Sequence, residues 1–285
     1  MVPSSSAVAT WELVLRLRVR REELGIPAKD IPGALGFTRN YWSAVENERR
    51  ILSAEKLATL LDLLEFEPDE RRELIALREV AKQRGWWTAY SGMFGDELSR
   101  YFGLEHGAQS LRTYEGSLVP GLLQTEEYAR AIMTADIAVR DIEVDRRLEV
   151  RLRRQERLLG DDPLRYTAII SESALAQQIG GRLVQRRQLD HLATMIEELP
   201  DTLRVLVVPF TATDCGLFGA STLCLLDFES PRLPTLVWQE TVTKRGFVDD
   251  SDKERDISLT YTHALRRSTL DVSESLSLIR KHAKE

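Results

Sequence analysis

The stretch LGIPAKDIPGALGFTRNYWSAVENERRILSAEKLATLLDLL, residues 24–64, decides the fold of the first part of this chain. Its apolar residues Ile31, Leu35 and Val45 have the spacing of two short helices that share a small core. Gly36 stands where the chain has to turn sharply between these helices, and glycine readily adopts the left-handed backbone of such a turn. The pattern predicts a helix-turn-helix, with a further helix closing behind it.

The second of these helices is predicted to begin after Thr38, because a threonine hydroxyl often caps a helix N-terminus. Its exposed face and the loop that follows present side chains able to reach phosphate oxygens and base edges. Arginine can pair with guanine and asparagine with adenine through two hydrogen bonds, each pair worth roughly 1–3 kcal/mol of discrimination. The expected DNA-binding residues are Lys29, Thr38, Arg39, Asn40, Tyr41, Ser43, Asn47, Arg49 and Arg50.

Pro32 complicates this interpretation, because it falls inside the helix expected over residues 28–35. A proline in a helix interior removes a backbone hydrogen bond and costs about 3 kcal/mol. Either the helix begins late, with Pro32 in its first turn, or it is distorted. Either outcome would alter how the following helix is presented, so a degenerate helix-turn-helix that no longer binds DNA remains an alternative.

The composition allows two globular domains, since the chain has 285 residues, of which 43% are hydrophobic and 29% charged. The formal net charge is −6, yet residues 1–60 hold nine Lys or Arg against seven Asp or Glu. DNA affinity depends on a local basic face and not on the global sum. Because this local excess is small, we expect a homodimer, in which the contacts to double-stranded DNA are doubled.

The sequence gives no sign of export or membrane insertion. No apolar run approaches the roughly 20 residues of a membrane-spanning helix, and the first residues, MVPSSSAVAT, lack the basic and apolar regions of a secretion signal. Cys215 and Cys224 are the only cysteines, and we expect them to be reduced, packed thiols. A cytoplasmic protein without a membrane partner is therefore expected.

Hydrophobic periodicity predicts a helical first part and a mixed second part. Helices are expected over residues 11–23, 28–35, 39–46, 53–64 and 68–84, and later over 125–133, 141–159, 173–179, 183–199, 249–267 and 272–282. Strands are expected over residues 165–170, 203–208, 222–228 and 236–240. The predicted fold class is α+β, with an all-α helix-turn-helix domain (1–85), a packed connector (86–109) and an α+β sensor, dimerisation or partner-binding domain (110–285).

Two segments resemble known families. Residues 11–64 resemble the phage-repressor-like helix-turn-helix domain of the XRE, or Cro-like, type. Residues 96–280 resemble the antitoxin-like C-terminal domain of a group of actinobacterial transcriptional regulators. The second resemblance rests on LEHGAQSLRTYEGSLVPGLLQTEEYARAIM (104–133), RQERLL (154–159), ISESALAQQIGG (170–181), RQLDHL (187–192) and ESLSLIR (274–280).

These resemblances imply a sequence-specific transcriptional regulator with a very small acidic protein, encoded nearby, as its partner. Within the repressor-like part, Arg39 and Asn40 match positions that usually contact bases or phosphates. Ala28 stands where that family commonly has a glutamine spanning phosphate and base. The loop whose phosphate contacts fix the register is matched by Asn47, Arg49 and Arg50. The alternative function is an antitoxin-like interaction module that has lost DNA binding.

A ligand or partner pocket is a second candidate site. Trp86, Trp87 and Tyr90 would line it, although clustered aromatic residues also pack as core. Glu172 and Glu240 follow strands and could converge on one pocket, with a purely structural role as the alternative. The histidines are scattered without metal-ligand spacing, and no nucleophile or phosphate-loop motif occurs. We therefore expect no catalytic residue, no metal and no cofactor in a protein that is not an enzyme.

Overall fold

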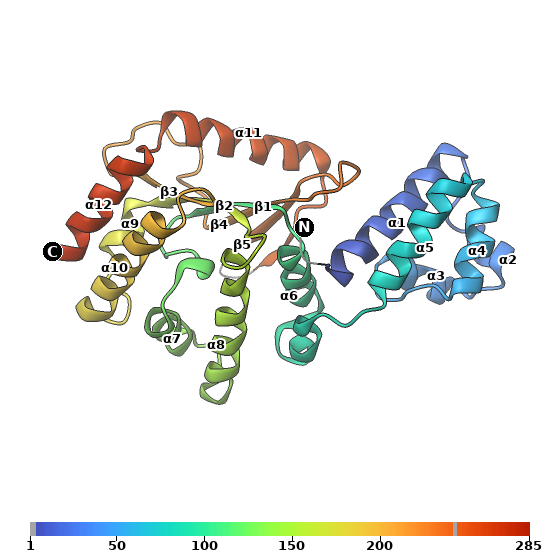
Figure 1. Ribbon diagram of the computed structural model, residues 1–285, viewed down its shortest axis with the longest axis horizontal. Coiled ribbons are helices and arrows are strands. Elements are labelled where there is room, and N and C mark those ends of the chain that lie inside the picture. The colour runs from blue at the N-terminus through green and yellow to red at the C-terminus, as the bar shows by residue number, and fades with distance from the viewer. Residues whose placement is uncertain (1–3, 242–243) are drawn as a thin grey trace. The chain divides into compact units, whose positions relative to one another are not determined.

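The computed structural model describes residues 4–241 and 244–285, which fold into two compact units (Figure 1). The first unit ends at Gly107, and the second is Ala108–Glu285. The regular elements described in the first unit are all helices, whereas the second combines a mixed β-sheet with helices. The α+β class predicted from the sequence is confirmed.

The first unit has its helices in the predicted order, with shifted ends. They are α1 (Ser6–Glu23), α2 (Ile31–Leu35), α3 (Arg39–Glu46), α4 (Ala54–Leu63), α5 (Pro68–Ala81), the short 3-10 helix η1 (Trp86–Tyr90) and α6 (Ser91–His106). The first helix begins five residues earlier than predicted because the Ser5 hydroxyl caps it, accepting a hydrogen bond from the Val8 amide. Most of the expected connector, residues 86–107, forms η1 and α6 within this unit.

A leucine-rich core holds the first unit together. Helix α4 contributes Leu57, Leu60 and Leu61, which lie on one side of the helix and are completely buried. Full burial of one leucine side chain contributes roughly 1.5–3 kcal/mol. The rest of this core is made by Leu13, Leu17, Ile31, Trp42, Val45, Leu52, Leu64, Phe66 and Leu74. Helices α2 and α3 are therefore fixed on a rigid support.

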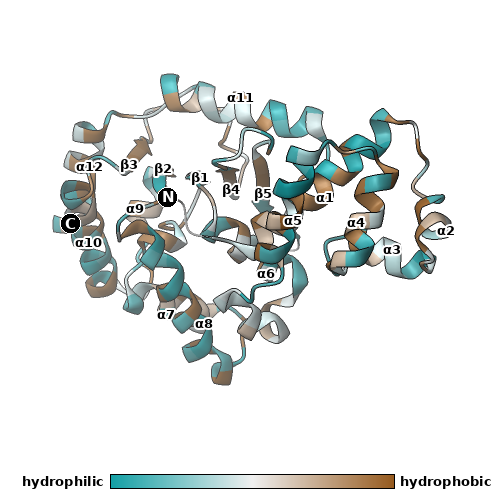
Figure 2. Ribbon diagram, turned by 45° about the vertical axis from the view of Figure 1, so that its right-hand side comes forward, coloured by the Kyte–Doolittle hydropathy of each residue, from teal (hydrophilic) through white to brown (hydrophobic). Residues whose placement is uncertain are grey.

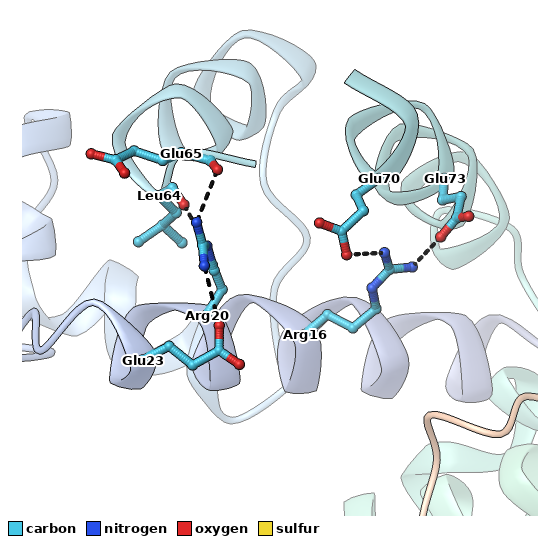
Figure 3. A network of polar contacts seen from close by, with 7 residues as sticks. All are labelled: Arg16, Arg20, Glu23, Leu64, Glu65, Glu70 and Glu73. Carbon is cyan, nitrogen blue, oxygen red and sulfur yellow. Dashed lines mark hydrogen bonds and ion pairs between the residues drawn. The ribbon is translucent and has the colours of Figure 1, made fainter. Parts of the chain in front are cut away.

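Two arginines of α1 tie this helix to α5 and to the turn before it (Figure 3). Arg16, whose side chain is 8% exposed, donates hydrogen bonds to the carboxylates of Glu73 (2.8 Å) and Glu70 (3.4 Å). Arg20 donates to the backbone carbonyls of Leu64 (3.0 Å) and Glu65 (3.1 Å). Glu65 ends α4 with a positive φ of 53°. Arg20 thus fixes a turn that a non-glycine residue adopts only at a cost.

The second unit alternates strands and helices. Its first half contains β1 (Ser110–Glu115), η2 (Gly121–Leu123), α7 (Glu126–Ala135), α8 (Asp141–Gln155), η3 (Glu156–Leu158), β2 (Arg165–Ser171), α9 (Glu172–Ala176) and α10 (Arg182–Glu198). Its second half contains β3 (Leu203–Val208), β4 (Thr222–Asp227), β5 (Leu236–Glu240), β6 (Arg245–Phe247), α11 (Ser251–Arg267) and α12 (Val272–Lys284). Thr125 caps α7 as its hydroxyl accepts a hydrogen bond from the Tyr128 amide.

In the described residues, six strands form one sheet in the order β3-β2-β1-β4-β5-β6. Strands β1, β2 and β3 are parallel, and β4, β5 and β6 each run antiparallel to the preceding strand in this order. Helix α11 covers one face, and α7 to α10 lie on the other (Figure 1). Strands buried on both faces need nearly continuous apolar sequence, and β3 and β4 are coloured mostly hydrophobic in Figure 2.

Strand β1 lies at the centre of this sheet, although the sequence analysis did not predict it. Its polar side chains find partners on β4: Arg112 donates two hydrogen bonds to Asp227 (2.9 and 3.1 Å), and Glu115 accepts one from the Thr222 hydroxyl (2.8 Å). A central strand with these charges does not show the usual apolar pattern. The short strand β6 was also missed.

Three glutamines fix the loop VPGLLQ, residues 119–124, that precedes α7. The Gln124 side chain donates to the carbonyl of Val119 (2.7 Å), and Gln155 donates to the carbonyls of Gly121 (3.1 Å) and Gln124 (2.7 Å). Gln188 of α10 donates to the Leu123 carbonyl and accepts from the Thr125 amide, both at 2.7 Å. The motif that supports the C-terminal resemblance is therefore a structural lock between α7, α8 and α10.

Candidate nucleic-acid interface

The turn between α2 and α3 is intact despite Pro32. Helix α2 begins at Ile31, three residues later than predicted, so Pro32 lies in its first turn, where a backbone N–H has no partner inside the helix. Gly36 then takes a left-handed conformation (φ 66°, ψ 34°), and the Phe37 amide donates to the Pro32 carbonyl at 2.8 Å. The prediction of a helix over 28–35 was wrong in its start, and the proline explains why.

Helix α3 has the predicted bounds and two distinct faces. Trp42 and Val45 are buried in the core, 6% and 3% exposed. Thr38 caps the helix, its hydroxyl accepting a hydrogen bond from the Tyr41 amide at 3.2 Å. The side chains on the outer face of α3 and at its cap are exposed: Thr38, Arg39, Asn40 and Ser43. The head of α3 thus presents a guanidinium and a carboxamide side by side.

A stack of aromatic rings and cations flanks this face. The rings of Phe37 and Tyr41 are stacked with their centroids 4.5 Å apart. The Arg50 guanidinium lies 5.0 Å from the centre of the Tyr41 ring. Lys56 Nζ lies 4.0 Å from the centre of the Phe37 ring. Attraction between a cation and an aromatic face holds each charge in place, so two cations from different segments stand beside the head of α3.

Lys56 was not among the residues expected from the sequence. Its position in the first turn of α4, after the N-cap Ser53, suggested only a helix start. Lys56 is identified by its contact with the Phe37 ring, 19 residues earlier in the chain. Helix periodicity cannot predict that contact. Lys29, which was expected, is exposed in the turn that precedes α2.

The segment after α3 closes the helix and then exposes two arginines. Asn47 donates from its side chain to the Ser43 carbonyl (2.7 Å) and hydroxyl (3.3 Å), so both residues cap the helix end. The Arg49 amide donates to the Ala44 carbonyl at 2.8 Å. Arg49 and Arg50 are exposed. This arrangement brings Arg39, Asn40, Arg49, Arg50 and Lys56 together around one short helix.

The aromatic residues expected in a pocket belong to the first unit, where they pack with one another. Trp86 lies 5.9 Å from Trp87 and 6.2 Å from Tyr90, edge to face, measured between ring centroids. Trp87 and Tyr90 are buried. A Cβ on Gly85 or Gly103 would stand within 3 Å of the Trp87 ring. These contacts describe a packed aromatic cluster that needs glycine on two sides.

The carboxylates expected to converge, Glu172 and Glu240, stand apart within the second unit. Strands β1 and β4 separate β2 from β5, which places these residues roughly 14 Å apart at the usual strand spacing. Glu172 contacts His282 Nε2 at 3.0 Å and accepts from the Phe210 amide at 2.6 Å. Glu240 accepts from the Trp238 indole at 2.9 Å. The sheet does not bring them together.

Glu115 has the largest pKa shift among the acidic residues described, and the sequence analysis did not select it. It lies in one row across the sheet with Thr222 and Glu240. Burial raises the pKa of Glu115 to about 8; the Thr222 hydrogen bond opposes this shift, the Glu240 charge adds to it, and the Arg151 charge lowers it. A protonated carboxyl is therefore favoured inside this sheet at neutral pH.

The described residues contain no helix that could cross a membrane and no group of three or more His, Cys, Asp or Glu residues arranged to hold a metal ion.

Comparison with known protein families separates the two parts of the chain. A family model described as a helix-turn-helix domain matches residues 12–74, which include α2, α3 and α4. A second family model, described as a domain of unknown function (DUF5753), matches residues 98–281. No curated protein and no solved structure matches the chain.

Proposed function

The chain belongs to the family of proteins with the DUF5753 domain, and we propose that it is a sequence-specific DNA-binding transcriptional regulator of the XRE type. The N-terminal helix-turn-helix domain is the part that binds DNA. The observation that supports this function best is the exposed head of α3, where Arg39 and Asn40 stand on a capped helix with a buried opposite face.

In this proposal, α3 enters the major groove of the duplex. That groove, about 12 Å wide, admits an α-helix, and residues near the N-terminus of a recognition helix contact the base edges. Arg39 has the donors to read a guanine, and Asn40 has the donor and acceptor pair to read an adenine. Both belong to the first turn of α3.

The surrounding cations hold the phosphate backbone. Arg49 and Arg50 follow α3, Lys56 lies in the first turn of α4, and Lys29 precedes α2. Contacts of this kind fix the register of a protein on DNA and make its affinity fall as salt rises. The one carboxylate inside this loop, Glu48, is paired with Arg100 and so offers the phosphates less repulsion.

The alternative function, an antitoxin-like module with a degenerate helix-turn-helix, depended on Pro32 altering how α3 is presented. Although α2 starts late, the turn at Gly36 is intact and α3 has its expected bounds and cap, which favours the DNA-binding function instead. The exposed, uncovered character of the α3 head within its own unit supports the same choice.

We further propose that the regulator acts in the cytoplasm as a homodimer and has no catalytic role. Two copies would place their α3 helices in half-sites about one helical turn apart, 34–36 Å for B-form DNA. In this proposal the second unit receives a signal from a small acidic partner protein or a small ligand. The small local positive charge supports the homodimer, in which the DNA contacts are doubled. The resemblance to antitoxin-like regulators supports the small acidic partner.

A selection experiment tests the DNA-binding function. Duplexes bound by the full-length protein are enriched from a random pool, and affinities for the enriched and a scrambled duplex are measured by fluorescence anisotropy. We expect at least about a thousandfold preference, which is the lower end of known specificity ratios. Enrichment of no sequence, or equal affinity for both duplexes, would contradict the proposal.

The variant pair R39A and R72A sharpens this test. Arg72 is also an exposed arginine on a helix of the first unit, but it lies on α5 and pairs with Asp69. R72A should keep the preference, whereas R39A should lose most of it. Sedimentation equilibrium with and without the enriched duplex then measures whether two copies bind each site.

A further inference from the structure

Glu48, immediately after the recognition helix, has a backbone conformation that its side chain disfavours. Its φ is 60°, and in the described residues only Glu48 and Glu65 combine a positive φ with a side chain other than glycine's hydrogen. Steric repulsion between Cβ and the backbone makes this region costly for L-residues. Such a conformation persists only where surrounding contacts hold it.

Arg100 of α6 supplies that contact. Its Nε donates to one carboxylate oxygen of Glu48 at 2.7 Å, and its terminal nitrogen donates to the other at 2.8 Å. The side chains are 28% and 15% exposed, so solvent reaches this pair only in part. A planar guanidinium that engages both oxygens of a carboxylate fixes its orientation as well as its position.

The backbone of this turn sets the direction of the two arginines that follow. The Glu48 amide donates to the Val45 carbonyl at 3.0 Å, and the Arg49 amide donates to the Ala44 carbonyl at 2.8 Å. The second of these hydrogen bonds requires the left-handed conformation of Glu48. If φ relaxed to a negative value, the chain would leave α3 in another direction, and Arg49 and Arg50 would move with it.

The helix that holds the turn belongs to the first unit, although the family model for the C-terminal domain covers part of it. Helix α6 packs in the first unit, where the Ser5 hydroxyl donates to the Gly103 carbonyl at 2.6 Å. Yet the family model for the C-terminal domain already begins at residue 98, before Arg100. Strand β1 starts at Ser110, only a few residues after α6 ends. Arg100, which lies in the segment matched by the C-terminal family model, thus contacts Glu48 in the loop after α3.

We propose that Arg100 is a positioning residue for DNA binding: it holds Glu48 in its left-handed conformation and thereby aims Arg49 and Arg50 at the phosphate backbone. The proposal rests on the DNA-binding function proposed above. It predicts that Arg100 contributes to DNA affinity only when residue 48 has a side chain that disfavours the left-handed conformation. Glycine at position 48 adopts a positive φ without steric cost.

A double-mutant cycle measures this dependence. The full-length protein, R100Q, E48G and E48G/R100Q are titrated with an enriched duplex and with a random duplex by fluorescence anisotropy. R100Q is expected to weaken binding of both duplexes by about tenfold, equivalent to a 1.4 kcal/mol loss, and to reduce the salt slope. In the E48G background the same change is expected to cost less than about twofold, since glycine needs no support.

The control is Arg20, which donates a hydrogen bond to the backbone carbonyl of Glu65, the other glutamate with a positive φ (Figure 3). This turn lies at the opposite end of α4 from Lys56. R20Q weakens a turn of the same kind, and we expect it to leave both DNA affinities unchanged. Circular dichroism verifies that each variant is folded at the assay temperature. If R100Q does not fold, R100K serves instead, because it keeps the charge but loses the two-point contact.

Three outcomes would overturn the proposal. These are equal losses from R100Q in both backgrounds, wild-type affinity of R100Q or R100K, and a loss in R20Q as large as that in R100Q. Failure of the wild-type protein to bind any duplex would overturn the DNA-binding function together with this proposal. Binding by the wild type with no coupling between positions 48 and 100 would overturn this proposal alone.

Discussion

Lys56 Nζ lies 4.0 Å from the centre of the Phe37 ring, which joins the first turn of α4 to the turn that precedes α3. The same ring stacks on Tyr41, and Tyr41 lies below the Arg50 guanidinium. Two cations from separate segments are therefore fixed relative to α3 before DNA is present. Preorganised charges lose less conformational entropy on binding than flexible ones do.

Replacing Lys56 by glutamine tests this arrangement. K56Q should weaken binding to all duplexes by a similar factor and reduce the slope of log affinity against log salt by about 1, as loss of one phosphate contact does. Lys82, an exposed lysine at the end of α5, provides the control variant K82Q. Anisotropy titrations at several salt concentrations measure both effects. A changed base preference in K56Q, or an unchanged slope, would argue against a phosphate contact.

Arg39 and Arg49 should differ in the kind of loss that they cause. Arg39 begins α3 and faces the bases in the proposed complex, so R39A should relax base preference at one position by about 1–3 kcal/mol. R49A should weaken every sequence alike and reduce the salt slope by about 1. Parallel selections from a random pool with both variants give the comparison. If both variants lose affinity with unchanged preference, the assignment of Arg39 to a base is wrong.

The lock around α7 should contribute measurably to the stability of the second unit. Gln188 is completely buried and satisfies the Leu123 carbonyl and the Thr125 amide, so Q188A would leave one buried and one partly buried backbone group unpaired. An expected loss of about 2–4 kcal/mol follows from the cost of such groups. R187A, one position earlier on α10, removes only an exposed ion pair with Glu127 and should cost less than about 1 kcal/mol.

Urea denaturation of the full-length variants, followed by tryptophan fluorescence and circular dichroism, measures these two losses. Similar midpoints for Q188A and R187A would show that the glutamine does not lock the loop.

The raised pKa of Glu115 predicts how the stability of the second unit depends on pH. Folding raises this pKa from 4.5 to about 8 because the carboxyl is buried. Between these values the folded state holds a proton that the unfolded state has lost, so the contribution of Glu115 to stability is greatest below pH 4.5 and declines as pH rises toward 8. This term should vanish in E115Q, in which position 115 no longer titrates.

Thermal unfolding at a series of pH values between 5 and 8.5 tests the assignment. The midpoint of E115Q should fall less steeply with pH than that of the wild type. E229Q, which changes an exposed glutamate between β4 and β5, should keep the wild-type slope. Parallel profiles for E115Q and the wild type would mean that another group titrates in this range.

The local features of the helix-turn-helix could be predicted from the sequence because they depend on neighbouring residues. Thr38 caps α3 as predicted, and Ser53 and Thr125, where helices were expected to begin, cap α4 and α7. These caps need only a hydroxyl and a helix-forming segment directly after it. Helix α2 was predicted too long, and of the two outcomes that Pro32 left open, the late start is the one observed.

Long-range pairs account for what the sequence analysis missed. Strand β1 was missed because Arg112 and Asp227, 115 positions apart, neutralise each other only in the folded sheet. Arg100 stayed unnoticed for the same reason, since Glu48 lies 52 positions away. Glu172 and Glu240 were expected to converge because the strand order was unknown. These contacts depend on strand pairing and on the side on which a helix packs. The spacing of residues along the chain does not predict either.

Methylation interference at guanine N7 tests the central claim most directly, because N7 faces the major groove. The enriched duplex is partially methylated, and bound and free fractions are compared for the wild type and for R39A. Insertion of α3 into the major groove predicts interference at guanines within each half-site, and loss of interference at one of them in R39A. Interference at no guanine, or the same pattern for both proteins, would contradict the assignment of α3 as the helix that reads DNA.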